Sequence, residues 1–132
     1  MKEVTKLMIN EFKIKQLGFD FMGYSLRKGE NYTFHHLIVP KRDGGKMSRN
    51  NGAILCGKSS HPYLHIIEAK DYDIFDYITK KMIGENIKGY LDIHDIRKIH
   101  EVLKIFEREH SGDITKKGHP LIKEEYTRRK KL

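Results

Sequence analysis

The chain has little cysteine: Cys56 is the single thiol among 132 residues. One thiol cannot form an internal disulfide, and it excludes a structural zinc site built on several cysteines. This usage is typical of a reducing compartment, and we expect a cytoplasmic protein. Cys56 itself is expected to be a small buried hydrophobic residue.

Long apolar runs are also missing. The longest cluster, around residues 37–39, is far shorter than the roughly 20 residues that a membrane crossing needs, and no signal-peptide pattern opens the sequence. A hydrophobic content of 38% is enough for one modest core. We therefore expect a single domain over residues 1–132, with no room for a second catalytic domain.

Acidic residues are in the minority. The 26 Lys and Arg outnumber the 18 Asp and Glu, which leaves a net charge of +8 and a pI near 9.5. Much of the excess lies in a basic tail at residues 116–132. A basic surface favours a polyanionic partner such as nucleic acid, because lysine and arginine neutralise phosphates and release counterions. Charge alone does not identify that partner.

Periodic apolar residues predict several helices. Apolar positions three and four apart, set among Lys and Glu, are typical of helices that bury one face. Glycine, or a Ser-Gly pair, follows each such stretch and favours its end there. The expected helices span residues 3–17, 73–83 and 92–110. A further helix is expected to begin at Ser59 or Ser60, with Pro62 tolerated in its first turn.

Between these helices the sequence indicates a β-hairpin. Aromatic and β-branched residues predict extended segments. Pro40 closes one of them and leads into a basic loop that contains Gly44 and Gly45. The expected extended segments are residues 19–25, 32–39 and 53–56. The combination predicts an α+β fold with its core at residues 19–70.

Four histidines and one asparagine gather in this hairpin and the helix after it. His61 and His65 lie one helical turn apart, so both rings point to one face and can chelate one divalent ion. A nitrogen from His35 would complete a set of three ligands and leave an open coordination position.

Adjacent strand residues point to opposite faces, so His35 and His36 are not expected to bind the same ion. If His35 is a ligand, His36 is free to act as a general base near neutral pH. An amide from the facing strand could orient that base. Asn51 is preferred over Asn50 for this role, because Asn51 immediately precedes the apolar run at residues 52–56.

The same residues resemble the HNH endonuclease motif. The strings that carry the likeness are HHLIVP at residues 35–40, GG at 44–45, NGAILC at 51–56 and HPYLH at 61–65. The paired histidines resemble in particular the double-histidine version of colicin-type nuclease domains. The likeness covers about 30 of the 132 residues. The flanking helices resemble nothing that would indicate a sequence specificity.

The resemblance implies a ββα-metal (His-Me finger) centre that hydrolyses DNA with one divalent ion. It implies metal ligands at His35, His61 and His65, a general base at His36, and an orienting residue at Asn51. Imidazole ligands favour Zn²⁺, Ni²⁺ or Mn²⁺, and an open phosphate site also works with Mg²⁺. Cutting both strands would need either a homodimer or two sequential nicks.

The sequence departs from many HNH members and leaves alternatives open. Many members have two CxxC pairs that hold a structural zinc, and these pairs are absent here. The positions where they would be sought read FMGY at residues 21–24 and CGKS at 56–59. A non-catalytic nucleic-acid-binding module with a structural metal is the main alternative, and RNA cleavage is another.

Several further residues have less specific patterns. In the hairpin loop, Lys41, Arg42 and Lys46 are candidates for phosphate binding, although a merely solvated turn is nearly as good an interpretation. Glu68 could receive a ring N–H from His65, but an ordinary solvent-facing carboxylate is the preferred interpretation. No role is assigned to the four remaining histidines, which are His94, His100, His110 and His119.

Overall fold

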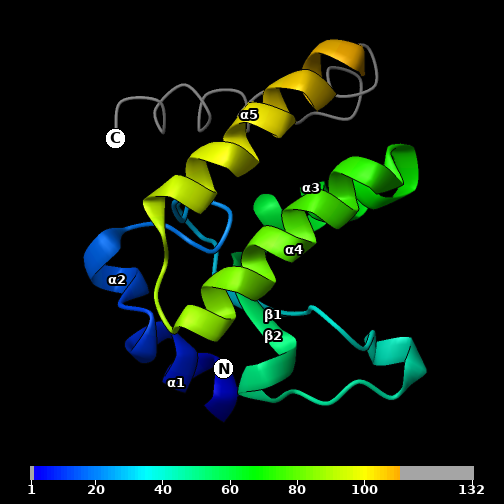
Figure 1. The fold of residues 1–132 in the computed structure, drawn as a ribbon. Coiled ribbons are helices and arrows are strands. Elements are labelled where there is room, and N and C mark those ends of the chain that lie inside the picture. The colour runs from blue at the N-terminus through cyan, green and yellow to red at the C-terminus, as the bar shows by residue number, and fades with distance from the viewer. Residues whose placement is uncertain (1, 111–132) are drawn as a thin grey trace.

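A two-stranded antiparallel sheet and three long helices form the body of the protein. The computed structural model describes residues 2–110 (Figure 1). Strand β1 (Tyr32–His36) pairs with β2 (Gly52–Cys56). Helix α3 (Ser60–Lys70) follows β2 and packs against it. This hairpin with helices agrees with the predicted α+β class. The basic tail at residues 116–132 lies outside the described residues.

Helices α4 (Tyr72–Lys88) and α5 (Ile93–Glu109) complete the body. Helix α4 packs against α3, α5 and β2, and in Figure 1 the middle of the loop between the strands projects away from α4 and α5. To the apolar core these two helices contribute Ile78, Met82, Ile96, Ile99, Leu103 and Phe106. No described helix combines the length and the apolar character that a membrane crossing requires.

The N-terminal helix is shorter than its apolar spacing predicts. In place of one helix over residues 3–17, the structure has α1 (Glu3–Glu11) and a short α2 (Ile14–Leu17). Lys13 separates them with a left-handed φ of 54°. The bend allows the apolar residues on both sides to be buried, including Phe12 and Ile14.

The segment at residues 19–25 was predicted to be extended, and it forms turns instead. Asp20 is the reason. Its buried carboxylate accepts backbone hydrogen bonds from Met22, Tyr24 and Cys56, each at 2.9 Å. These donors would otherwise need strand partners, so the side chain replaces a third strand.

Two element ends also differ from the predicted ones. Strand β1 stops at His36 and not at Val39, because the side chain of Asn51 takes the next backbone amides. The helix expected at residues 73–83 runs through Gly84 and ends at Gly89, which has a left-handed φ of 82°. The helix predicted at residues 92–110 agrees closely with α5. Asp92 caps its start by accepting a hydrogen bond from the His94 amide at 2.9 Å.

Glu85 gives the fold a testable pH dependence. It is buried on α4, and burial raises the pKa of its carboxyl well above the ordinary value of 4.5, with a further increase from the charge of Asp95. The unfolded chain loses this proton near pH 4.5 while the folded chain keeps it. The contribution of Glu85 to the free energy of unfolding should therefore slope downward above pH 4.5, by up to about 1.4 kcal/mol per pH unit, until the folded pKa is passed.

Glu85→Gln is expected to remove this slope and to make the protein more stable than wild type at pH 7. Urea unfolding between pH 4.5 and pH 8 measures the effect. Glu101→Gln, an exposed acid of α5, is the matched control and should keep the wild-type slope. Parallel stability curves for wild type and Glu85→Gln would contradict the assignment.

Candidate functional site

The two adjacent histidines of β1 lie on opposite faces of the hairpin. His35 pairs with Ala53 and His36 with Gly52. The ring of His35 faces α3, with centroids 5.1 Å from His61 and 5.4 Å from His65. The ring of His36 instead contacts the edge of Phe34, two residues back on the strand, at 4.9 Å. The strand thus directs the two imidazoles to different surroundings.

Three histidines form a cluster that could hold a metal ion. One possible ligand atom from each of His35, His61 and His65 lies within 4.8 Å of the others. Nδ1 of His35 and Nε2 of His61 are 3.3 Å apart. Two nitrogens that bind a tetrahedral Zn²⁺ at about 2.0–2.1 Å are themselves about 3.3 Å apart. The closest pair therefore already has a separation that suits coordination.

Thr33 contacts Nδ1 of His61, the ring nitrogen that does not face His35. Its hydroxyl lies 3.2 Å from the carbonyl oxygen of Leu55 and 2.7 Å from Nδ1 of His61. A hydroxyl has one proton, so when Thr33 donates to Leu55 it must accept from Nδ1–H of His61. Nε2 then carries the lone pair and faces His35. Such an outer partner is what fixes a metal-binding imidazole in other proteins.

Glu68 does the same for His65. Its carboxylate lies 3.0 Å from Nδ1 of His65, one turn along α3. A carboxylate only accepts, so Nδ1 carries a proton, and Nε2 has the lone pair whenever the ring is neutral. The preferred interpretation of Glu68 as an ordinary solvent-facing carboxylate is thus replaced by a specific contact. Both helix histidines present the same nitrogen.

Burial keeps two of the three rings neutral. It lowers the pKa of His35 from 6.5 to about 3, and the neighbouring His61 and His65 lower it further. Burial likewise lowers the pKa of His61 to about 4. A neutral imidazole is the form that binds metal. At neutral pH these two rings are already uncharged, so no extra proton has to leave them before an ion can bind.

Asn51 holds the loop that follows His36. Its Oδ1 accepts from the amides of Ile38 and Val39, both at 2.8 Å. Its Nδ2 donates to the carbonyl oxygens of Val39, at 2.9 Å, and Lys46, at 3.2 Å. One side chain therefore ties the beginning of the loop to its end. Asn50 is exposed and has no comparable set of contacts.

The loop in turn contacts His36. The backbone of Gly45 forms a hydrogen bond with the ring and opposes the stronger effects of burial and of Lys41, which lower the pKa of His36. Nε2 is shielded from solvent and has no hydrogen-bond partner among the described residues, so the bond engages Nδ1. A Cβ on Gly45 would lie 1.8 Å from the Val39 oxygen, so this close approach requires glycine.

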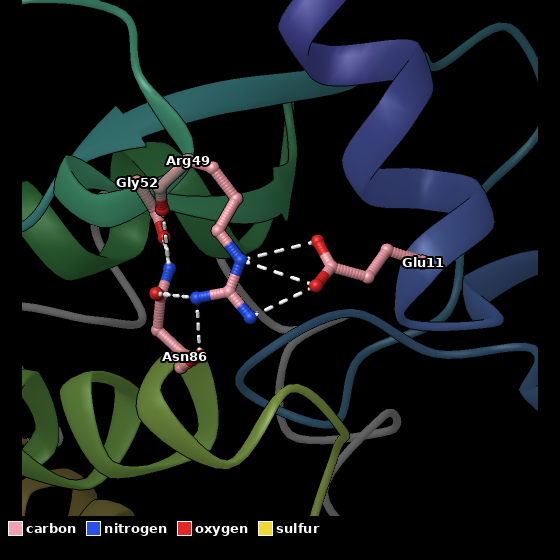
Figure 2. A network of polar contacts seen from close by, with 4 residues as sticks. All are labelled: Glu11, Arg49, Gly52 and Asn86. Carbon is pink, nitrogen blue, oxygen red and sulfur yellow. Dashed lines mark hydrogen bonds and ion pairs between the residues drawn. The ribbon is translucent and has the colours of Figure 1, made fainter.

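A polar network anchors the far end of the same loop (Figure 2). Arg49 lies in a 3₁₀ turn, Arg49–Asn51 (η2), and pairs with Glu11 of α1 at 2.9 Å. Asn86 of α4 accepts from Arg49 and donates to the carbonyl oxygens of Arg49 and Gly52. Two helices distant in sequence, α1 and α4, therefore fix the chain around Asn51.

Two of the three predicted phosphate-binding residues line the cavity beside the cluster. The cavity has a volume of about 900 Å³ and is lined by all three clustered histidines and by His36. Lys41 and Arg42 reach it from a second 3₁₀ turn, Lys41–Asp43 (η1). Lys46 is exposed but does not line it; its carbonyl group is held by Asn51.

The remaining histidines lie away from this cluster. His94 is exposed, and His100 is buried with Nε2 2.8 Å from the carbonyl oxygen of Met22. His110 forms a second possible ligand group with Asp71 and Glu109, which sequence spacing could not reveal because 38 residues separate Asp71 from Glu109. Exposed acidic groups commonly gather without binding metal. His119 lies outside the described residues, and Cys56 is fully buried, as predicted.

Comparison with protein-family models, curated protein sequences and solved structures finds no match to this chain. What the site can do must therefore be argued from its own geometry and chemistry.

Proposed function

We propose that the chain is a metal-dependent DNA endonuclease of the HNH, or ββα-metal, kind. One observation carries the proposal: a hairpin and the helix after it gather His35, His61 and His65 while directing His36 to the other face. Three clustered imidazoles, two of them kept neutral by burial, form a ligand set with open positions for phosphate and water. The basic cavity beside them suits a polyanionic substrate.

The protein's own residues would divide the work. His35, His61 and His65 would hold one divalent ion, with Thr33 and Glu68 keeping the two helix rings in the required tautomer. The ion, when bound, would stabilise negative charge on the phosphate and on the leaving oxygen. Zn²⁺, Ni²⁺, Mn²⁺ and Mg²⁺ are all candidates.

His36 would remove the proton from the attacking water. Nδ1 is engaged by Gly45, so the unpartnered Nε2 is the nitrogen that would act as base. That atom is shielded, and the loop after His36 must yield for water to reach it. Asn51 would limit this movement by holding both ends of the loop. Lys41 and Arg42 would contact phosphate oxygens.

The shielding of Nε2 also favours the second candidate function. If His36 never meets water, the three other histidines could hold a metal that only stabilises the fold of a nucleic-acid-binding module. In that case metal would raise the melting temperature without allowing cleavage. The two functions therefore differ in a measurable way.

Supercoiled plasmid is the test substrate. Purified protein should convert it to nicked or linear DNA when Mg²⁺, Mn²⁺, Ni²⁺ or Zn²⁺ is added, and not in excess chelator. The same assay with RNA oligonucleotides separates DNA cleavage from RNA cleavage. Binding of DNA and metal with no cleavage under any of these ions would reject the endonuclease and leave the structural metal.

A further inference from the structure

The cavity beside the histidines has an aromatic wall as well as basic residues. Tyr72 and Phe75, both at the start of α4, line it with ring centroids 5.5 Å apart. Tyr72 is 61% exposed, which leaves most of a large ring open to solvent. From the hairpin loop, Ile38 and Met47 line the same cavity at 59% and 38% exposure. Apolar groups thus reach the cavity from two separate elements.

Charge in this cavity favours an anion. Its lining includes four basic residues, which are Lys2, Lys41, Arg42 and Lys80. The acidic lining residues are already engaged, since Glu68 contacts His65 and Asp76 pairs with Lys80 at 2.8 Å. The combination of exposed aromatic rings and cations is typical of surfaces that bind bases and phosphates together.

The same face of α4 carries a free polar group. Thr79, about two turns after Tyr72, lines the cavity, and its buried hydroxyl has no hydrogen-bond partner among the described residues. This hydroxyl is therefore a hydrogen-bonding group that the described part of the protein leaves unused on the cavity side of α4.

Unpaired bases fit these features better than a duplex does. In a duplex the faces of the bases are stacked on one another, so an aromatic side chain at the backbone cannot reach them. An unpaired strand exposes a face of each base for stacking while its phosphates meet the lysines and arginine. We propose that Tyr72 and Phe75 stack on unpaired bases, so that the substrate is single-stranded DNA or a single-stranded segment beside the cleaved bond. This inference deepens the proposed nuclease function and rests on it for the scissile bond.

Fluorescence anisotropy in excess chelator tests base stacking apart from cleavage. A labelled single-stranded oligonucleotide of about 15 nucleotides is compared with its duplex, at about 0.15 M salt to limit nonspecific attraction. Wild-type protein should bind the single strand more tightly, and Tyr72→Ala should weaken that binding about tenfold. The matched control is Tyr90→Ala, because Tyr90 is 56% exposed but does not line the cavity.

The outcomes separate the inference from the nuclease proposal. Equal or tighter binding of the duplex, or equal losses for Tyr72→Ala and Tyr90→Ala, would overturn the inference even if plasmid is cut. A loss of single-strand binding in Tyr72→Ala but not in Tyr90→Ala, without plasmid cleavage by wild type, would support the inference and reject the nuclease proposal. Circular dichroism of each variant tests for a folding defect. Tyr72→Phe should bind the single strand like wild type, because it keeps the aromatic ring.

Discussion

His36→Ala is expected to abolish metal-dependent cleavage while leaving metal binding largely intact. A positioned general base contributes about 10²–10⁴-fold to the rate of such a reaction. The three clustered histidines do not depend on His36, because its ring contacts Phe34 on the opposite face. Plasmid cleavage and calorimetric titration of Zn²⁺, performed on the same preparation, measure the two properties separately.

His94→Ala is the control for the loss of a histidine, since His94 is exposed on α5, outside the cluster and the cavity lining. It should retain both properties. Added imidazole should partly restore cleavage by His36→Ala, since a free imidazole can occupy the vacated space and accept the proton. Cleavage at the wild-type rate by pure His36→Ala would remove His36 from the role of base.

Local patterns explain what the sequence could predict. Capping signals located the start of α3, and apolar spacing located α5 and the start of α4 to within a residue or two. The alternation of strand side chains separated His35 from His36. These arguments use only local backbone geometry, which acts over a few residues. They succeed where the chain's own geometry decides the structure.

Contacts between distant segments explain the errors. The turns at residues 19–25 depend on Asp20 meeting the amide of Cys56, 36 residues away. No local pattern signals that an aspartate will take the place of a strand partner. In the same way Gly84 was expected to end a helix, but α4 continues to Lys88, and its Asn86 contacts Arg49 and Gly52, which lie more than 30 residues earlier in the chain.

The outer residues of the site illustrate the same limit. Thr33 is recognised as a partner of His61 only once β1 and α3 are placed side by side, 28 residues apart in sequence. A retrospective signal exists, because Thr33 and His35 are two residues apart on one strand and must share a face. Glu68 is a candidate from sequence because it is three residues from His65, but only the structure provides the 3.0 Å contact.

His65→Ala is expected to weaken metal binding more than any change outside the three clustered histidines. It removes one of three proposed ligand nitrogens, and that side chain is 54% exposed, so truncation leaves the core packing almost unchanged. Glu68→Ala should have a smaller effect, about tenfold, because it removes only the partner that orients the ring. Calorimetric titration with Zn²⁺ or Ni²⁺ at pH 7 gives the affinities.

The second group of possible ligands requires its own control in this titration. His110→Ala disrupts the group formed with Asp71 and Glu109, and it should leave the high-affinity binding unchanged. The order of effects is therefore specific: large for His65→Ala, intermediate for Glu68→Ala, and none for His110→Ala. If His110→Ala caused the large loss, the metal would bind at the end of α5, and the histidines of the hairpin and α3 would no longer be the metal centre.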